Sequence, residues 1–219
     1  MKKSFKDWKT EELELAFGLR PVKDHPMLTT WLGNPQPVPE DMKKSIREIQ
    51  SLLQERINFW NEDELKFQFI GPFMRLLNLN GDRYSTFSQR AIVEDIPDVQ
   101  GKIVSLKGIP EVLVALGKQD PRQPFFFIKE YKPERGRDKD PQGQLLAAMF
   151  AAQQKNALKF PLKGCYVVGR NWFFVILNGL EYAVSDAYVS TQDDLFDIYS
   201  NIKKVKQEIE DFIATHNLT

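Results

Sequence analysis

Apolar residues recur along the chain with two different spacings, one typical of helices and one of strands. Between residues 40 and 60 the steps are three and four, which places Met42, Ile46, Ile49, Leu53, Ile57 and Trp60 on one helical face. Asn61 is a favourable N-cap for a second helix, because Glu64 stands three residues later as in a capping box. We expect that helix to run to about residue 76, with a kink near Gly71-Pro72.

The middle of the chain is rich in β-branched and aromatic residues, which favour strands. We expect strands at 84–93, 102–106, 111–117, 125–132, 164–168, 172–177 and, more briefly, 182–184. The third and fourth of these are almost continuously apolar, which is typical of strands that are buried on both faces. A helix is expected between the fourth and fifth strands, beginning at Pro141 with Asp140 as its N-cap and ending near Asn156.

Both ends of the chain add helical segments to this middle part. The many prolines before residue 39 predict one or two short helices, the first with Thr10 as N-cap, and a loop. We expect this extension to pack on the main body through Trp8, Phe17 and Trp31. The chain closes with a long amphipathic helix, whose apolar residues are Leu195, Ile198, Ile202, Val205, Ile209 and Phe212.

The order of these elements predicts an α/β (α+β) fold with a mixed central β-sheet flanked by helices. A length of 219 residues suits one domain with a helical extension. We therefore expect one globular unit with three parts: an N-terminal extension (1–38), a core (39–190) and a C-terminal helix (191–219).

Composition narrows the class of protein. The single cysteine, Cys165, excludes an intrachain disulfide and lies in an apolar run, so we expect it to be a small buried residue. Neither a signal peptide nor an apolar stretch of roughly 18 residues is visible, which predicts a cytoplasmic protein without a membrane partner. The 30 basic and 30 acidic residues cancel, which argues against strong non-specific binding of nucleic acid but leaves room for a local basic patch.

Charged residues interrupt two of the apolar strands. Glu130 and Lys132 are two positions apart, so in a strand they project from the same face, roughly 6–7 Å apart. A charge at the end of the apolar run 125–128 is costly unless it is paired or binds a metal. Glu111 opens another apolar strand directly after Pro110, so the Glu111 and Glu130 carboxylates converge if the two strands are neighbours.

Two convergent carboxylates suit Mg²⁺, with Mn²⁺ as a substitute, and the backbone carbonyl of Tyr131 would supply a further oxygen ligand. Such a metal lowers the pKa of a bound water and stabilises charge on a phosphate. Lys132 would hold or activate the attacking water, or neutralise developing charge. The pattern indicates phosphodiester hydrolysis without histidine, since His25 and His216 lie near the chain ends.

These residues and their order resemble the PD-(D/E)XK nuclease superfamily. More closely, residues 40–185 resemble bacterial proteins related to the N-terminal nuclease domain of type I restriction endonuclease subunits. The resemblance implies a restriction-endonuclease-like core in which Pro110-Glu111 supplies the first acid. Glu130 and Lys132 would then be the Glu-x-Lys pair, and the activity would be that of a Mg²⁺-dependent endonuclease acting on DNA, of restriction or repair type.

The resemblance also implies two further site residues. Glu64 is the best match to an acid on the helix before the sheet that completes the metal site, although its capping position explains it equally well. Gln144 matches a glutamine on the helix after the Glu-x-Lys strand, with Gln142 as the second candidate.

One departure from the family pattern supports an alternative function. The first acid is usually aspartate, and the longer Glu111 shifts the carboxylate in a site whose Mg²⁺ geometry is strict. The alternative is a catalytically weak or inactive module that binds nucleic acid or a protein partner, with the C-terminal helix docking that partner or a second copy in a homodimer. The loop residues Arg135, Arg137 and Lys139 would contact phosphates or simply be solvated.

Overall fold

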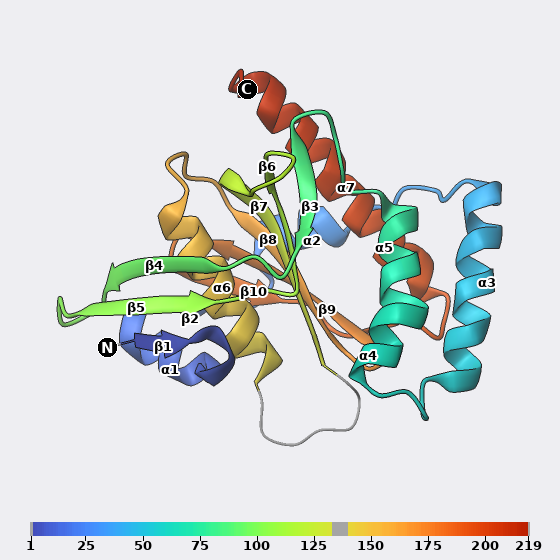
Figure 1. Cartoon of the computed structure of the whole chain (residues 1–219), viewed down its shortest axis with the longest axis horizontal. Helices are drawn as coiled ribbons and strands as arrows, with labels where there is room; N and C mark the ends of the chain where they lie inside the picture. The colour runs from blue at the N-terminus through green and yellow to red at the C-terminus, as the bar shows by residue number, and fades with distance from the viewer. Residues whose placement is uncertain (1, 133–139, 219) are drawn as a thin grey trace.

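A mixed β-sheet with helices on both faces forms the centre of the protein (Figure 1). The computed structural model describes residues 2–132 and 140–218. The large sheet has the order β2 (Arg20–Pro21), β10 (Glu181–Val184), β9 (Asn171–Asn178), β8 (Leu162–Val168), β7 (Arg122–Lys132), β6 (Val112–Leu116) and β3 (Tyr84–Ser88), and β11 (Tyr188–Val189) pairs with β9. A small second sheet has the order β1 (Lys2–Ser4), β5 (Ile103–Gly108) and β4 (Ile92–Pro97).

The helices divide between the two faces of the large sheet. One face carries α2 (Pro26–Leu32), α3 (Glu40–Arg56), α4 (Glu62–Leu65), the π-helical segment η2 (Lys66–Ile70), α5 (Gly71–Leu77) and α7 (Asp194–Thr215). The other face carries the short 3-10 helix η1 (Phe5–Asp7), α1 (Thr10–Phe17) and α6 (Pro141–Lys155), together with the small sheet. This mixed α/β arrangement with a long C-terminal helix agrees with the predicted fold class. No helix of the described residues is long and apolar enough to cross a membrane.

The sheet separates two hydrophobic cores, and β7 contributes to both. Phe127 and Tyr131 point into the core under α3, α5 and α7, whereas Ile128 points into the core under α6. Strand alternation produces this split, because successive side chains leave opposite faces. The near-continuous apolar runs of β6 and β7 are therefore explained by burial on both sides, as expected.

Several local predictions are confirmed. Asp140 caps α6 by accepting a hydrogen bond from the Gly143 backbone N–H, with Pro141 in the first turn. Asn61 and Glu64 form the expected capping box. The aromatic residues of the N-terminal extension, Trp8, Phe17 and Trp31, are buried, and so is Cys165.

Two predictions are wrong, and a third is confirmed with a change of helix type. Segment 84–93 is not one strand: β3 ends at Ser88 in the large sheet, Gln89 adopts a positive φ of 51°, and β4 begins at Ile92 in the small sheet. Segment 61–76 is helical throughout, as expected: α4, η2 and α5 follow one another without a break, and the π-helical segment directly before Gly71-Pro72 is a typical cause of a kink. Lys9, not Thr10, is the N-cap of α1, because the Thr10 backbone N–H and hydroxyl both donate to Asp140.

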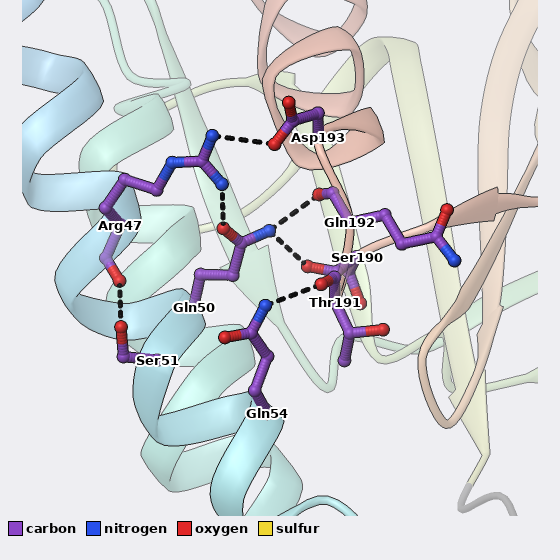
Figure 2. Close-up of polar contacts among 8 residues, drawn as sticks. All are labelled: Arg47, Gln50, Ser51, Gln54, Ser190, Thr191, Gln192 and Asp193. Carbon is purple, nitrogen blue, oxygen red and sulfur yellow. Dashed lines mark hydrogen bonds and ion pairs between the residues drawn. The ribbon is translucent and has the colours of Figure 1, made fainter.

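Side chains of α3 fasten this helix to the turn between β11 and α7 (Figure 2). The buried Gln50 amide donates to the carbonyls of Ser190 and Gln192, at 2.9 and 2.6 Å. The exposed Gln54 amide donates to the Thr191 carbonyl at 2.7 Å, one helical turn further along (Figure 2). The Ser190 and Thr191 carbonyls have no strand partner in the described residues, so α3 supplies their hydrogen bonds, whereas the Gln192 carbonyl also accepts one from the Leu195 backbone N–H.

Replacing Gln50 with alanine is expected to lower the free energy of unfolding by about 1–3 kcal/mol, because the Ser190 carbonyl, which is shielded from water, loses its donor. Urea unfolding followed by circular dichroism measures this loss. Gln54→Ala is the matched control and should cost less than about 1 kcal/mol, since water replaces the lost donor at an exposed position. Equal losses in the two variants would contradict the account.

Candidate functional site

The pairing of β6 with β7 places the two predicted acids side by side. Val112 pairs with Lys129 in this antiparallel ladder, so Glu111, one residue earlier, lies beside Glu130. The negative charge of Glu111 contributes to raising the pKa of Glu130, as expected for neighbouring carboxylates. The two strands are therefore neighbours, which is the condition on which the predicted convergence of the carboxylates depended.

Glu130 is fully buried under α6. Gln144 on that helix donates an amide hydrogen bond of 2.7 Å to Glu130 Oε2. The other carboxylate oxygen, Oε1, has no hydrogen-bond partner among the described residues. Burial is the main cause that raises the Glu130 pKa, to about 8, and so favours the protonated form of the carboxyl group. A cation that bound there would compete with this proton.

Lys132 ends β7 on the same strand face as Glu130 and is half-buried. Its positive charge is the largest influence that lowers the Glu130 pKa, although burial outweighs it. The structure thus places Lys132 and Gln144 beside Glu130, with Glu111 at the neighbouring position just before β6.

The structure does not bring Glu64 to this group as a third acid. Glu64 is exposed, and its carboxylate accepts a hydrogen bond of 2.7 Å from the Asn61 backbone N–H. Within residues 2–132 and 140–218, no three histidine, cysteine, aspartate or glutamate side chains form a group that could hold a metal ion. The side chains available to a cation here are therefore the pair Glu111 and Glu130, and a ligand role for the Tyr131 carbonyl stays a prediction.

Two lysines near the site were missed in the sequence. Lys66 on η2 places its ammonium 3.3 Å from Glu111 Oε1 and 2.9 Å from Glu62 Oε1. The same ammonium lies 4.5 Å from the centre of the Tyr131 ring. Glu111 therefore already has a cationic partner. The spacing of Glu62 and Lys66 by four residues predicts their own pairing, but no local pattern connects Lys66 to Glu111.

Lys129 is the second missed lysine and is fully buried on the opposite face of β7 from Glu130. Its ammonium has no hydrogen-bond partner among the described residues and lies 4.8 and 5.0 Å from the ring centres of Tyr131 and Trp172. Burial lowers the Lys129 pKa to about 8. The sequence indicated that Lys129 would be buried, because Lys129 directly continues the apolar run 125–128.

The remaining predicted residues lie elsewhere or outside the described chain. Gln142 accepts a hydrogen bond from the Tyr166 hydroxyl at 3.3 Å, which leaves Gln144 as the glutamine at Glu130. The basic cluster Arg135, Arg137 and Lys139 lies outside the described residues. The fold and site define a mixed α/β protein in which Glu130 is buried under α6 and the half-buried Glu111, next to it across the strands, pairs with Lys66. No known protein family and no curated protein matches the chain.

Proposed function

We propose that this protein is a Mg²⁺-dependent nuclease of the PD-(D/E)XK type that hydrolyses phosphodiester bonds in DNA. One observation carries the proposal: Glu111 and Glu130 lie side by side on adjacent strands, with Lys132 on the face of Glu130 and Gln144 bound to Glu130. A pair of carboxylates with a lysine beside it is the donor set that metal-assisted phosphodiester cleavage needs.

The order of the central strands supports the same proposal. β3, β6 and β7 are successive antiparallel neighbours in the large sheet, and α6 then crosses to β8, which is parallel to β7. The Pro-Glu strand, the Glu-x-Lys strand, a glutamine-bearing helix and a further strand therefore follow one another, in keeping with a restriction-endonuclease-like core. Figure 1 shows α6 lying across the face of these strands.

The residues of the site fit a hard divalent cation. Glu130 Oε1 is a buried carboxylate oxygen without a hydrogen-bond partner in the described chain, and Glu111 adds a second carboxylate. Mg²⁺ prefers such oxygen ligands, and when bound it would lower the pKa of a water molecule and neutralise charge on the phosphate. The Tyr131 carbonyl is the proposed third ligand.

Each neighbouring side chain has a distinct role in this proposal. Gln144 holds the Glu130 carboxylate in one orientation through its 2.7 Å hydrogen bond. Lys132 orients the attacking water or stabilises the negative charge that develops on the phosphate. Lys66 balances Glu111 before a metal binds, since its ammonium lies 3.3 Å from that carboxylate.

A cleavage assay tests the proposal directly. Purified protein is incubated with plasmid DNA and with single-stranded DNA, in Mg²⁺, in Mn²⁺ or in excess EDTA. We expect cleavage with either metal, none in EDTA, and a large loss of rate in Lys132→Ala. Absence of cleavage with both metals, or undiminished cleavage by Lys132→Ala, would overturn it.

A second function is favoured by a specific contact. The Lys66 ammonium already compensates Glu111, and the described residues hold no third acid for a metal. This arrangement suits a module that keeps the fold without catalysis and binds nucleic acid or a protein. Calorimetric titration with Mn²⁺ separates the two functions: no binding supports the module, whereas binding that is lost in Glu130→Ala supports the nuclease.

A further inference from the structure

A hollow of about 970 Å³ lies between α2, α7 and the large sheet, away from the carboxylate pair. None of Glu111, Glu130, Lys132 and Gln144 lines it. Its walls come from α2, the segment 33–36, α7 and residues of β7, β8 and β9. The volume is in the range of small-molecule sites, roughly 300–1,000 Å³. Figure 1 shows α2 and α7 on the same side of the sheet, where the two helices contact each other.

Aromatic side chains supply much of the hollow's wall. Phe160 contacts Phe212 on α7 with ring centres 4.5 Å apart, and Phe126 on β7 lies 5.9 Å from Phe160. Trp31 on α2 belongs to the same lining. Trp31 and Phe126 are buried and belong to the core, so this apolar wall is built before any ligand arrives. Such a wall suits an aromatic ring or a short alkyl chain.

The charges around the hollow are unbalanced. Its lining includes three lysines, at positions 163, 203 and 204, but only one carboxylate, Glu208, and the Lys203 ammonium donates to the Leu77 carbonyl outside the hollow. The Lys163 side chain is 14% exposed, and its ammonium pairs with Glu208 and lies 4.9 Å from the centre of the Trp31 ring. The Lys204 ammonium is held by neutral carbonyls, those of Trp31 and Gly33, each at 2.8 Å.

The Lys163 and Lys204 side chains both line the hollow, and their ammonium groups are close enough to influence each other. Burial is the main cause that lowers the pKa of Lys204, and the nearby charge of Lys163 lowers it further. Burial likewise lowers the pKa of Lys163, which Glu208 partly offsets. Because the Glu208 side chain is 52% exposed, it leaves this pair more easily than a buried partner would.

We propose that the hollow binds a small amphiphilic carboxylate, whose apolar body lies against Trp31, Phe126 and Phe160 and whose carboxylate pairs with Lys163 in place of Glu208. The carboxylate compensates the excess of positive charge, which a neutral ligand of the same shape leaves unchanged. A cationic ligand of the same shape meets repulsion from the lysines.

Isothermal titration calorimetry with three probes of equal chain length tests this site: octanoate, 1-octanol and octyltrimethylammonium. We expect octanoate to bind saturably with one site per chain, at least about tenfold more tightly than 1-octanol, and the cation not to bind. Lys163→Met should weaken octanoate about tenfold and leave 1-octanol unchanged. Lys118→Met, at an exposed position outside the hollow, is the matched control and should change neither.

Glu208→Gln gives a second, opposite readout. Removing this carboxylate frees Lys163, so octanoate should bind several-fold more tightly, a gain that a misfolded variant does not produce. The proposal is overturned if octanoate shows no saturable binding, if 1-octanol binds as tightly, or if neither variant changes the affinity for octanoate. None of these outcomes depends on nuclease activity.

Discussion

Replacing Glu130 with glutamine is expected to lower the rate of metal-dependent DNA cleavage at least about a hundredfold. The substitution keeps the shape of the side chain and removes the charge that would hold the cation beside Glu111. Initial rates on plasmid DNA at saturating Mg²⁺ measure the loss, and calorimetry with Mn²⁺ measures the accompanying fall in affinity. Cleavage by Glu130→Gln at the wild-type rate would show that the carboxylate pair is not the catalytic centre.

The same substitution should leave the fold intact, which makes the result interpretable. Burial raises the Glu130 pKa from 4.5 to about 8, so the contribution of Glu130 to stability is most favourable below pH 4.5, declines between pH 4.5 and 8, and is constant at higher pH. Glutamine cannot ionise, so the variant does not lose stability with rising pH in this way. Glu130→Gln should therefore match the wild type near pH 4.5 and exceed it above pH 8, by on the order of a few kcal/mol, in urea unfolding without metal.

Glu64→Gln is the matched control for the cleavage assay. Glu64 is exposed and caps α4 through the Asn61 backbone N–H, and glutamine serves in the same capping role. We expect this variant to retain cleavage close to the wild-type rate. A hundredfold loss would instead identify Glu64 as a metal ligand, the role that the resemblance implies for it.

Replacing Lys129 with methionine is expected to raise the free energy of unfolding by about 3 kcal/mol at pH 7. The Lys129 ammonium is fully buried without a hydrogen-bond partner in the described chain, and burial lowers its pKa from 10.5 to about 8. Methionine has a similar length and no charge to desolvate. Its sulfur can also pack against the Tyr131 and Trp172 rings that the ammonium now faces.

The gain should depend on pH in a defined direction. The folded-state pKa of Lys129 lies below its unfolded value, so the cost of burying the charge is complete below pH 8. That cost declines as pH rises from 8 towards 10.5 and is absent above it. Urea unfolding of both proteins at pH 7 and pH 10 measures the difference, which should be several-fold smaller at the higher pH.

Lys66→Met serves as the control for this effect. The Lys66 ammonium pairs with Glu62 and Glu111, so its removal leaves Glu111 without a cation and should not stabilise the protein. A loss of stability in Lys129→Met at pH 7 would contradict the account. It would mean that the contacts with Tyr131 and Trp172 outweigh the cost of burial.

The parts of the fold that depend on residues a few positions apart could be predicted from the sequence. The caps at Asn61 and Asp140, the apolar face of α3 and the apolar runs of β6 and β7 each depend on residues a few positions apart. Strand alternation likewise placed Glu130 and Lys132 on one face, because side chains two apart in a strand point the same way. The same rule, applied to Lys129, would have indicated a buried lysine on the opposite face.

The chain alone determined that a mixed α/β fold forms and that Glu111 and Glu130 would meet if their strands were neighbours. Only the tertiary structure decided that they are neighbours, that Gln144 reaches Glu130, and that Lys66 reaches Glu111 across 45 positions. It also decided that the chain leaves the large sheet after Ser88. Contacts of this kind depend on how helices pack on a sheet and on which strands pair, and neither hydrophobic spacing nor capping residues encode those choices locally.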